Sequence, residues 1–298
     1  MIAWLTEPFQ YEFMQRALLG SAIIGFTNGF LGAFIVLRRL ALLADALSHS
    51  LLPGLALAAI FFGLAPAGLF FGALVATIFV GVGGQLIARS SRLKEDTAIG
   101  ALFVFAFAIG VILLGYSKVR VDLSHFLFGN VLGISNSDLW ISYGIGLFTM
   151  IFLALQHRPL LLALFEPAVA ATQGIRVGFL NVALMILTVL AMISSLQAVG
   201  VVLSLGLLIL PSTIMYLFSD SYDAMTWGGG ILGAAGSILG LLLSYWINLP
   251  SGPAIVLVLG ALFLIAYLFS PKYGILPTRF RRRHLHEESL QRWEKADQ

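Results

Sequence analysis

Two residues of types that can bind metal ions stand four positions apart in the stretch LALLADALSHSLLPGLALA, residues 40–58: Asp45 and His49. Residues i and i+4 share one face of a helix, so the carboxylate and the imidazole point the same way. Oxygen and nitrogen ligands of this kind suit manganese, iron or zinc as divalent ions. Two ligands are too few for a tight site, but a two-fold partner would double them to two Asp and two His. The spacing therefore predicts a weak metal site.

The position of this pair leaves two interpretations open. An ionisable group in the middle of a membrane costs about 2.5–3.5 kcal/mol on insertion scales, so such groups usually face a cavity and mark a transport pathway. Alternatively, Asp45 follows Arg39 by six residues and caps the start of the helix near the headgroups, while His49 simply lies in the interface. Pro53-Gly54, later in the same stretch, can free backbone carbonyls and bend the helix.

Composition places the pair in a membrane protein. Of the 298 residues, 59% are hydrophobic and 10% are charged, and the mean hydropathy is +0.98. A soluble domain carries about 25% charged residues. The chain has no cysteine, which excludes disulfides, thiolate metal sites and cysteine nucleophiles. The start, MIAWLTEPFQYEF, has neither a basic region nor a small-residue cleavage site, so we expect no removable signal peptide.

Uncharged runs predict an all-α fold, a polytopic bundle of transmembrane helices. A span needs roughly 20 mostly apolar residues. The runs give nine spans, with eight as the alternative, because the division of residues 177–219 near SSLQAVG is the least certain. The remaining runs are 17–37, 50–88 (two spans divided at Pro66, the first beginning near Asp45), 97–117, 139–156 and 224–271 (two spans divided at INLPSGP).

Lysine and arginine set the predicted orientation, because basic residues in short loops mark the cytoplasmic side. Nine spans with the N-terminus outside place fourteen of the seventeen Lys and Arg residues in the cytoplasm, together with the C-terminus. We expect one transmembrane domain over residues 1–271, with a cytoplasmic segment at about 157–176. A basic cytoplasmic tail follows over residues 272–298.

Small residues recur at helical spacing inside the predicted spans. The patterns are GFTNG at 25–29, GGILG at 229–233 and GSILG at 236–240. Such small-xxx-small patterns let helix backbones approach closely. We favour packing within one bundle over a dedicated dimer face.

Common catalytic motifs are absent from the sequence. None of the four lysines follows a glycine, so there is no GxxxxGK[ST] phosphate-binding loop, and neither HExxH nor GxSxG occurs. We therefore expect no enzyme activity in this chain. If ATP drives transport through it, a separate polypeptide must supply the ATPase.

The stretch RRLALLADALSHSLLPGLALA, residues 38–58, resembles the signature of the membrane permeases of bacterial ATP-binding-cassette importers for manganese, zinc and iron. The family signature usually reads R…GDALSHAVLPG, so Ala44 stands for its glycine and Ser50 for its alanine. Further stretches match in the family's order: EPFQYEFMQRALLG at 7–20, KEDTAIG at 94–100, VDLSHFLFGNVLGIS at 121–135, FEPAVAATQGI at 165–175, VGVVLSLGLLILPS at 199–212 and LPSGPAIVLVLGALFLIAYLFSP at 249–271.

The resemblance implies a transport subunit in a larger assembly. Permeases of this family work as pairs, each pair binds two cytoplasmic ATP-binding subunits, and an extracytoplasmic protein delivers the metal. Asp45 and His49 match the residues that line the family's metal pathway. The segment that docks on the ATPase corresponds to Glu166, Pro167, Ala168, Ala171, Gly174 and Ile175.

The resemblance also implies a bacterial inner-membrane location, a transported divalent metal in place of a resident cofactor, and no nucleic-acid partner. The opening and the FGNVLGIS stretch look most like manganese members, so we favour manganese over zinc and iron. Whether the pair of permeases is a homodimer or a heterodimer stays open.

Two further residues are weaker candidates for metal binding. Asp122 and His125, in DLSHFLFGN, are predicted on the outer side, where they would meet incoming metal or form a solvated loop pair.

The first rival function is an ATP-independent secondary transporter or channel, for which paired broken helices in both halves are typical. The second rival is a permease for a metal chelate or siderophore.

Overall fold

The computed structural model describes residues 7–38, 40–63, 65–116, 129 and 131–277. Helices account for nearly all of this part of the chain. Their bounds are η1 Glu7–Gln10, α2 Glu12–Leu37, α3 Ala41–His49, α4 Leu51–Phe62, α5 Pro66–Ser90, α6 Glu95–Tyr116, η2 Val131–Gly133, α8 Asn136–Leu155, α9 His157–Phe165, α10 Pro167–Thr172, α11 Val177–Val199, α12 Val201–Phe218, α13 Tyr222–Ile247 and α14 Ser251–Phe269.

Nine helical stretches in the described residues are long and apolar enough to cross a membrane, which confirms the predicted polytopic bundle and its span count. The least certain division is also confirmed. Gly200, with φ of 83°, separates α11 from α12 in the predicted SSLQAVG turn. A positive φ of this size favours glycine, because it lacks a Cβ. The second span differs from expectation, since it consists of two helices, α3 and α4, that meet at Ser50.

Local sequence signals explain where several helices begin. α5 begins at Pro66, where the missing N–H costs nothing because the first helical N–H groups have no partner within the helix. Ser135 caps α8 through a reciprocal capping box with Asp138. Glu95 and Asp96 lie in the first turn of α6, where negative side chains favour the helix dipole.

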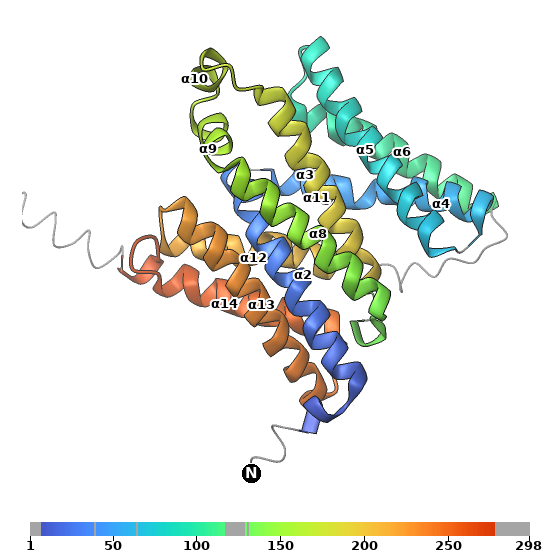
Figure 1. Cartoon of the computed structure of the whole chain (residues 1–298), viewed down its shortest axis with the longest axis vertical. Helices are drawn as coiled ribbons and strands as arrows, with labels where there is room; N and C mark the ends of the chain where they lie inside the picture. The colour runs from blue at the N-terminus through green and yellow to red at the C-terminus, as the bar shows by residue number, and fades with distance from the viewer. Residues whose placement is uncertain (1–6, 39, 64, 117–128, 130, 278–298) are drawn as a thin grey trace, which may run out of the picture.

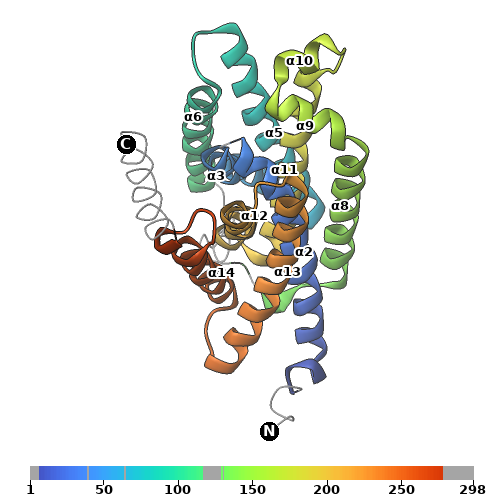
Figure 2. The ribbon, with the colours of Figure 1, turned by 90° about the vertical axis from the view of Figure 1, so that its left-hand side faces the viewer.

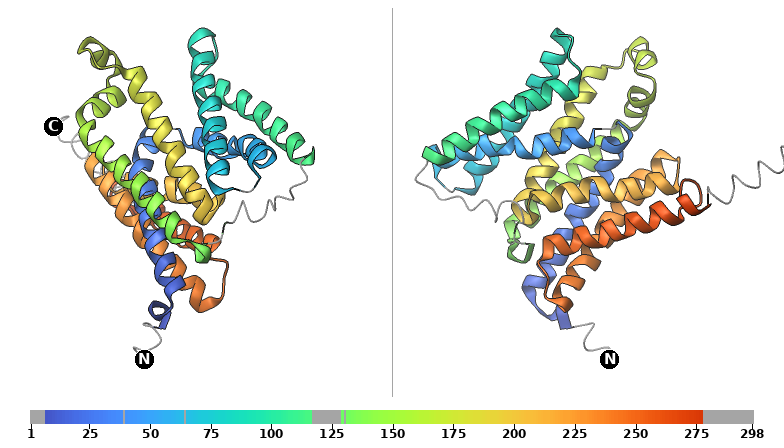
Figure 3. Two further views of the ribbon diagram at one scale, coloured as in Figure 1. Left: turned by 45° about the vertical axis from the view of Figure 1, so that its right-hand side comes forward. Right: turned by 180° about the vertical axis from the view of Figure 1, so that it is seen from behind.

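α2 is the central helix of the bundle. It lies between a group formed by α4, α5 and α6 on one side and a group formed by α12, α13 and α14 on the other, with α8 and α11 alongside (Figures 1 and 3). Of its most apolar window, 72% is buried within the protein, against 17% for α6. The outer helices therefore present apolar side chains outward, as lipid-facing helices do.

Glycines allow α2 to contact α13 backbone to backbone. A Cβ built on Gly29 would lie 2.2 Å from the carbonyl oxygen of Gly229, and one on Gly25 would lie 2.5 Å from that of Gly233. Ser212 of α12 donates a hydrogen bond to the Gly29 carbonyl at 2.6 Å. The GFTNG and GGILG patterns thus face each other within one chain, as expected for packing inside the bundle.

The segment with α9 and α10 lies at the opposite end of the molecule from the beginning of α2 (Figure 2). The turn between α5 and α6, which contains Arg92 and Lys94, lies at the same end as α10 (Figure 3). Basic residues from distant parts of the sequence therefore gather at one end of the bundle. This arrangement agrees with the charge asymmetry read from the sequence.

Candidate functional site

Asp45 and His49 lie together on α3. The Nε2 atom of His49 is 3.7 Å from Oδ1 of Asp45, and the two side chains are 36% and 54% exposed, respectively. On the opposite face of the same short helix, Ala44, Leu47 and Ser48 are buried. The predicted shared face is therefore confirmed. The buried face of α3 packs against the bundle, and the Asp45 and His49 side chains stay accessible.

Asp45 does not cap its helix, so that interpretation was wrong. α3 begins at Ala41 with Leu40 in the capping position, and no side chain caps it. Asp45 is the fifth residue of the helix, beyond the first-turn N–H groups that a cap satisfies. The carboxylate is consequently free to interact with the imidazole and with a ligand.

Among the described residues, Asp45 and His49 are the two candidate metal ligands at this place. Within the part of the chain that the structure describes, no group of three or more His, Cys, Asp or Glu side chains is arranged to hold a metal ion. A manganese or zinc ion normally takes four to six ligands. Two candidate ligands are fewer than that, so the half-site expected for a single copy stays a prediction.

Aromatic rings of α6 form the wall beside His49. The imidazole centroid is 5.9 Å from the ring of Phe103 and 6.2 Å from that of Phe107. Sequence reasoning did not identify these residues. Their i, i+4 spacing in FVFAF places both rings on one face of α6, but only the folded chain brings that face to His49. An apolar wall therefore borders the imidazole on this side.

The chain is interrupted directly after His49. Pro53 has no N–H and cannot donate to the His49 carbonyl, which lies four residues earlier. The hydroxyl of Ser50 donates to the Leu47 carbonyl at 2.7 Å, and Ser48 donates to that of Asp45 at 2.7 Å. The interruption that Pro53-Gly54 predicted is therefore present, at Ser50.

Glycines hold α4 firmly against its neighbours. A Cβ on Gly54 would lie 2.1 Å from the carbonyl oxygen of Gly72 in α5, and one on Gly110 in α6 would lie 2.8 Å from the Pro53 nitrogen. α4 is thus clamped between α5 and α6. The position of the α3–α4 joint, and with it that of His49, depends on these close contacts.

A second polar cluster lies just before α3. Arg38, which follows α2, donates from Nη2 to Oδ1 of Asn181 in α11 at 2.5 Å. Burial lowers the pKa of Arg38, and the nearby Glu95 carboxylate partly opposes that shift. Gln85 lines the same small cavity. Glu95, in the first turn of α6, lines this cavity too and so lies close to Arg38 at the end of α2.

The predicted docking segment forms two short helices, α9 and α10. Five of its six predicted residues are exposed: Glu166, Pro167, Ala168, Ala171 and Gly174. Ile175 is half-buried and packs against the bundle core, which includes the fully buried Ala170. Gly174, with φ of 79°, makes the turn that directs the chain into α11.

Two predicted metal candidates are not part of this description. Asp122 and His125 lie outside the described residues, as do residues 278–298 of the basic tail.

Comparison with known proteins identifies the family. Residues 10–270 match the family described as the ABC 3 transport family. The chain belongs to the ABC 3 transport family. The family resemblance seen in the sequence is therefore confirmed, because the match extends over the whole bundle.

Two membrane transport proteins resemble the chain over nearly its full length. It is 40% identical over 278 residues to the manganese transport system membrane protein MntC of Listeria monocytogenes, covering 93% of this chain and 98% of the relative. It is 37% identical over 270 residues to a probable iron transport system membrane protein of Haemophilus influenzae, covering 91% and 98%.

The helical arrangement also matches a solved structure. A chain of PsaBC from Streptococcus pneumoniae, solved in complex with Fab, superposes with a TM-score of 0.81 at 34% identity, covering 94% of this chain and 100% of that one. This ABC 3 family member therefore has the same polytopic helical fold as that PsaBC chain.

Proposed function

We propose that this chain is the membrane permease of an ATP-driven importer of divalent transition-metal ions, with manganese as the favoured cargo. The observation that carries the proposal is the Asp45–His49 pair, 3.7 Å apart on the accessible face of α3. Carboxylate and imidazole ligands suit manganese, zinc and iron as divalent ions. The manganese transport relative supports manganese, and the iron transport relative keeps iron as the competing cargo.

The pair is proposed to act in a dimer. Two copies, or this chain and a homologous one, would bring two carboxylates and two imidazoles to a shared pathway, which is enough for a divalent ion. Such a site binds weakly by design, because transport requires release as well as capture. The exposed fractions of 36% and 54% leave both side chains open to such a partner.

The energy is proposed to come from a separate ATPase that docks on the segment 157–176. Residues 165–169 and 171–174 of this segment are exposed, and the segment lies at the end of the bundle where basic residues gather, which supports a cytoplasmic position. The N-terminus then lies outside, the basic tail lies inside, and an extracytoplasmic binding protein delivers the metal to the other end. The setting is the inner membrane of a bacterium.

Metal uptake by cells tests the proposal. Radioactive manganese, zinc and iron would be supplied to cells that contain the permease, its ATPase and its binding protein. We expect Asp45→Asn and His49→Gln each to lower uptake by at least about 10–100-fold. Loss of a side chain that only orients a metal ligand already has an effect of that size. Asp96→Asn is the matched control, because Asp96 is also an exposed helical aspartate but lies far from α3 in the sequence.

The outcomes separate the rivals. Full uptake by both variants would overturn the assigned site, and the best-transported ion names the cargo. Uptake that survives depletion of ATP would favour a secondary transporter or channel. Uptake of a chelate with no uptake of the free ion would favour a siderophore permease.

A further inference from the structure

A cavity of about 740 Å³ opens where α8, α9 and α13 meet, away from the Asp45–His49 pair. Its apolar part is lined by Phe30, Leu153 and Trp227, and its polar rim by His157, Arg158 and Asp223. This volume lies in the range of about 300–1,000 Å³ that is typical of sites for small ligands. The metal pathway proposed above runs elsewhere, whereas His157 and Arg158 of the rim begin the segment 157–176 that is proposed to dock on the ATPase.

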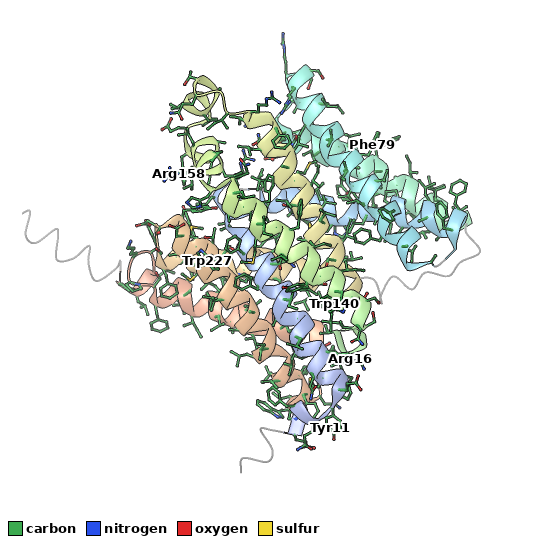
Figure 4. All side chains as sticks on the ribbon, in the orientation of Figure 1. Tyr11, Arg16, Phe79, Trp140, Arg158 and Trp227 are labelled. Carbon is green, nitrogen blue, oxygen red and sulfur yellow. The ribbon has the colours of Figure 1, made fainter. Side chains whose placement is uncertain are left out.

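The cavity lies at a membrane boundary. Leu155 ends one of the helices long and apolar enough to span a membrane, and Tyr222 begins another. Trp227 is half-exposed, with its ring 5.2 Å from that of Phe30, and tryptophan is enriched at the level of lipid headgroups. Figure 4 shows Arg158 and Trp227 on the same side of the molecule, with Arg158 nearer the end that contains α9. The polar rim therefore lies by the ends of two candidate spans, where headgroups are expected, and the apolar part lies further along those spans.

The rim carries one charge of each sign. Arg158 is exposed and forms no ion pair with any other described residue. The carboxylate of Asp223 lies 3.8 Å from Nε2 of His157, the residue next to Arg158, so both charged groups border the same opening. His157 in turn contacts the Tyr222 ring at 5.2 Å, which limits its movement.

We propose that this cavity binds a phospholipid with a primary ammonium headgroup, as in phosphatidylethanolamine, through Arg158 and Asp223. The guanidinium would bind the phosphate, for which its fork of donors is well suited. The ammonium would donate hydrogen bonds to Asp223. The glycerol and the upper part of one acyl chain would lie against Phe30 and Trp227.

The charge pattern selects this lipid over other common ones. A headgroup with only negative charge would bring its charge close to the Asp223 carboxylate, which is unfavourable. A trimethylated headgroup has no N–H and cannot donate to that carboxylate. Phosphatidylethanolamine alone among these matches both a guanidinium and a carboxylate.

Lipid binding to the purified, delipidated full-length protein tests the proposal. Phosphatidylethanolamine, phosphatidylcholine and phosphatidylglycerol with identical acyl chains would be titrated in detergent, and bound lipid counted by native mass spectrometry. We expect the first lipid to bind about tenfold more tightly than the other two, because charged hydrogen bonds of this kind typically separate affinities by that factor.

Variants test whether Arg158 binds the phosphate and Asp223 binds the ammonium. Arg158→Ala should weaken phosphatidylethanolamine binding about tenfold, and Arg158→Lys, which keeps the charge but not the fork of donors, should retain only part of it. Asp223→Asn should remove the preference over phosphatidylcholine while leaving phosphate binding intact. Arg92→Ala and Asp96→Asn are matched controls at exposed positions elsewhere and should change nothing. A helical circular dichroism spectrum identical to wild type shows that each variant is folded.

Three results would overturn the proposal. The first is equal binding of all three lipids. The second is tighter binding of phosphatidylglycerol that increases further with Asp223→Asn, which indicates a site for anionic lipid. The third is loss of bound phosphatidylethanolamine when the ATPase subunit is added, which indicates a protein contact at this cavity. The readout is lipid, so failure here is distinct from failure of metal transport.

Discussion

Arg38 donates a hydrogen bond to Asn181, a residue 143 positions later in the chain. Arg38 closes α2 and precedes the helix that bears Asp45 and His49, whereas Asn181 lies in the first turns of α11, directly after the segment proposed to dock on the ATPase. The bond therefore joins the entry to the candidate site with the exit from the docking segment. Glu95 adds a carboxylate from α6 to the same cluster.

Removing one partner of this bond should destabilise the protein. We expect Arg38→Met or Asn181→Leu to lower the free energy of unfolding by about 1.5–3 kcal/mol, because each leaves a half-buried polar group unpaired. The double variant should lose clearly less than the sum of the single losses. A double-mutant cycle from thermal unfolding in detergent measures this difference. Strictly additive losses would show that the two side chains do not interact.

The contact between α2 and α13 predicts a strong effect at Gly29. Alanine normally favours a helix over glycine by about 1 kcal/mol, yet a Cβ here would lie 2.2 Å from the Gly229 carbonyl oxygen. Gly29→Ala should therefore destabilise the protein by about 1–3 kcal/mol, as overpacking does. Gly144→Ala is the control, because a Cβ there meets nothing within 4 Å. Equal melting temperatures for the two variants would contradict the proposed packing role.

Because α10 has an exposed face, a substitution there should weaken ATPase binding without unfolding the protein. Ala168 and Ala171 are exposed, so Ala168→Arg should leave thermal stability within about 0.5 kcal/mol of wild type. The bulky charged side chain should nevertheless reduce co-purification of the ATPase. Thr97→Arg places the same side chain at an exposed position in the first turn of α6 and serves as the control. Equal ATPase recovery with both variants would remove α10 from the docking surface.

Asp220 predicts a loss of stability in acid. Lys272 donates to its carboxylate at 2.8 Å and Tyr273 at 2.7 Å, and these bonds hold the pKa of the Asp220 carboxyl below its ordinary value. The same carboxylate raises the pKa of Lys272. A lowered carboxyl pKa stabilises the fold above the unfolded value of about 3.9, and this contribution is lost as the pH falls through the folded pKa.

Thermal unfolding between about pH 3 and pH 7 should therefore show a decline at the acid end that is smaller in Asp220→Asn. For Lys272 the sign is opposite, since its contribution is present below about pH 10 and is lost at higher pH. Both contributions are complete near neutral pH. Identical acid profiles for the wild type and Asp220→Asn would contradict this assignment.

The sequence by itself determined the class of the protein and the number of spans. Hydropathy reflects the local free energy of transferring each segment into lipid, so it needs no knowledge of the fold. The division at Gly200 and the start of α5 at Pro66 also follow from local backbone preferences. The shared face of Asp45 and His49 follows from the helical period alone.

Only the tertiary structure decided what surrounds those two residues. The Phe103 and Phe107 wall, the Arg38–Asn181 bond and the contact of Gly29 with Gly229 each join residues far apart in the sequence. No local pattern specifies which helix faces which, because that choice depends on packing between whole helices. The cavity bordered by Arg158 and Asp223 arises in the same way, from the meeting of α8, α9 and α13.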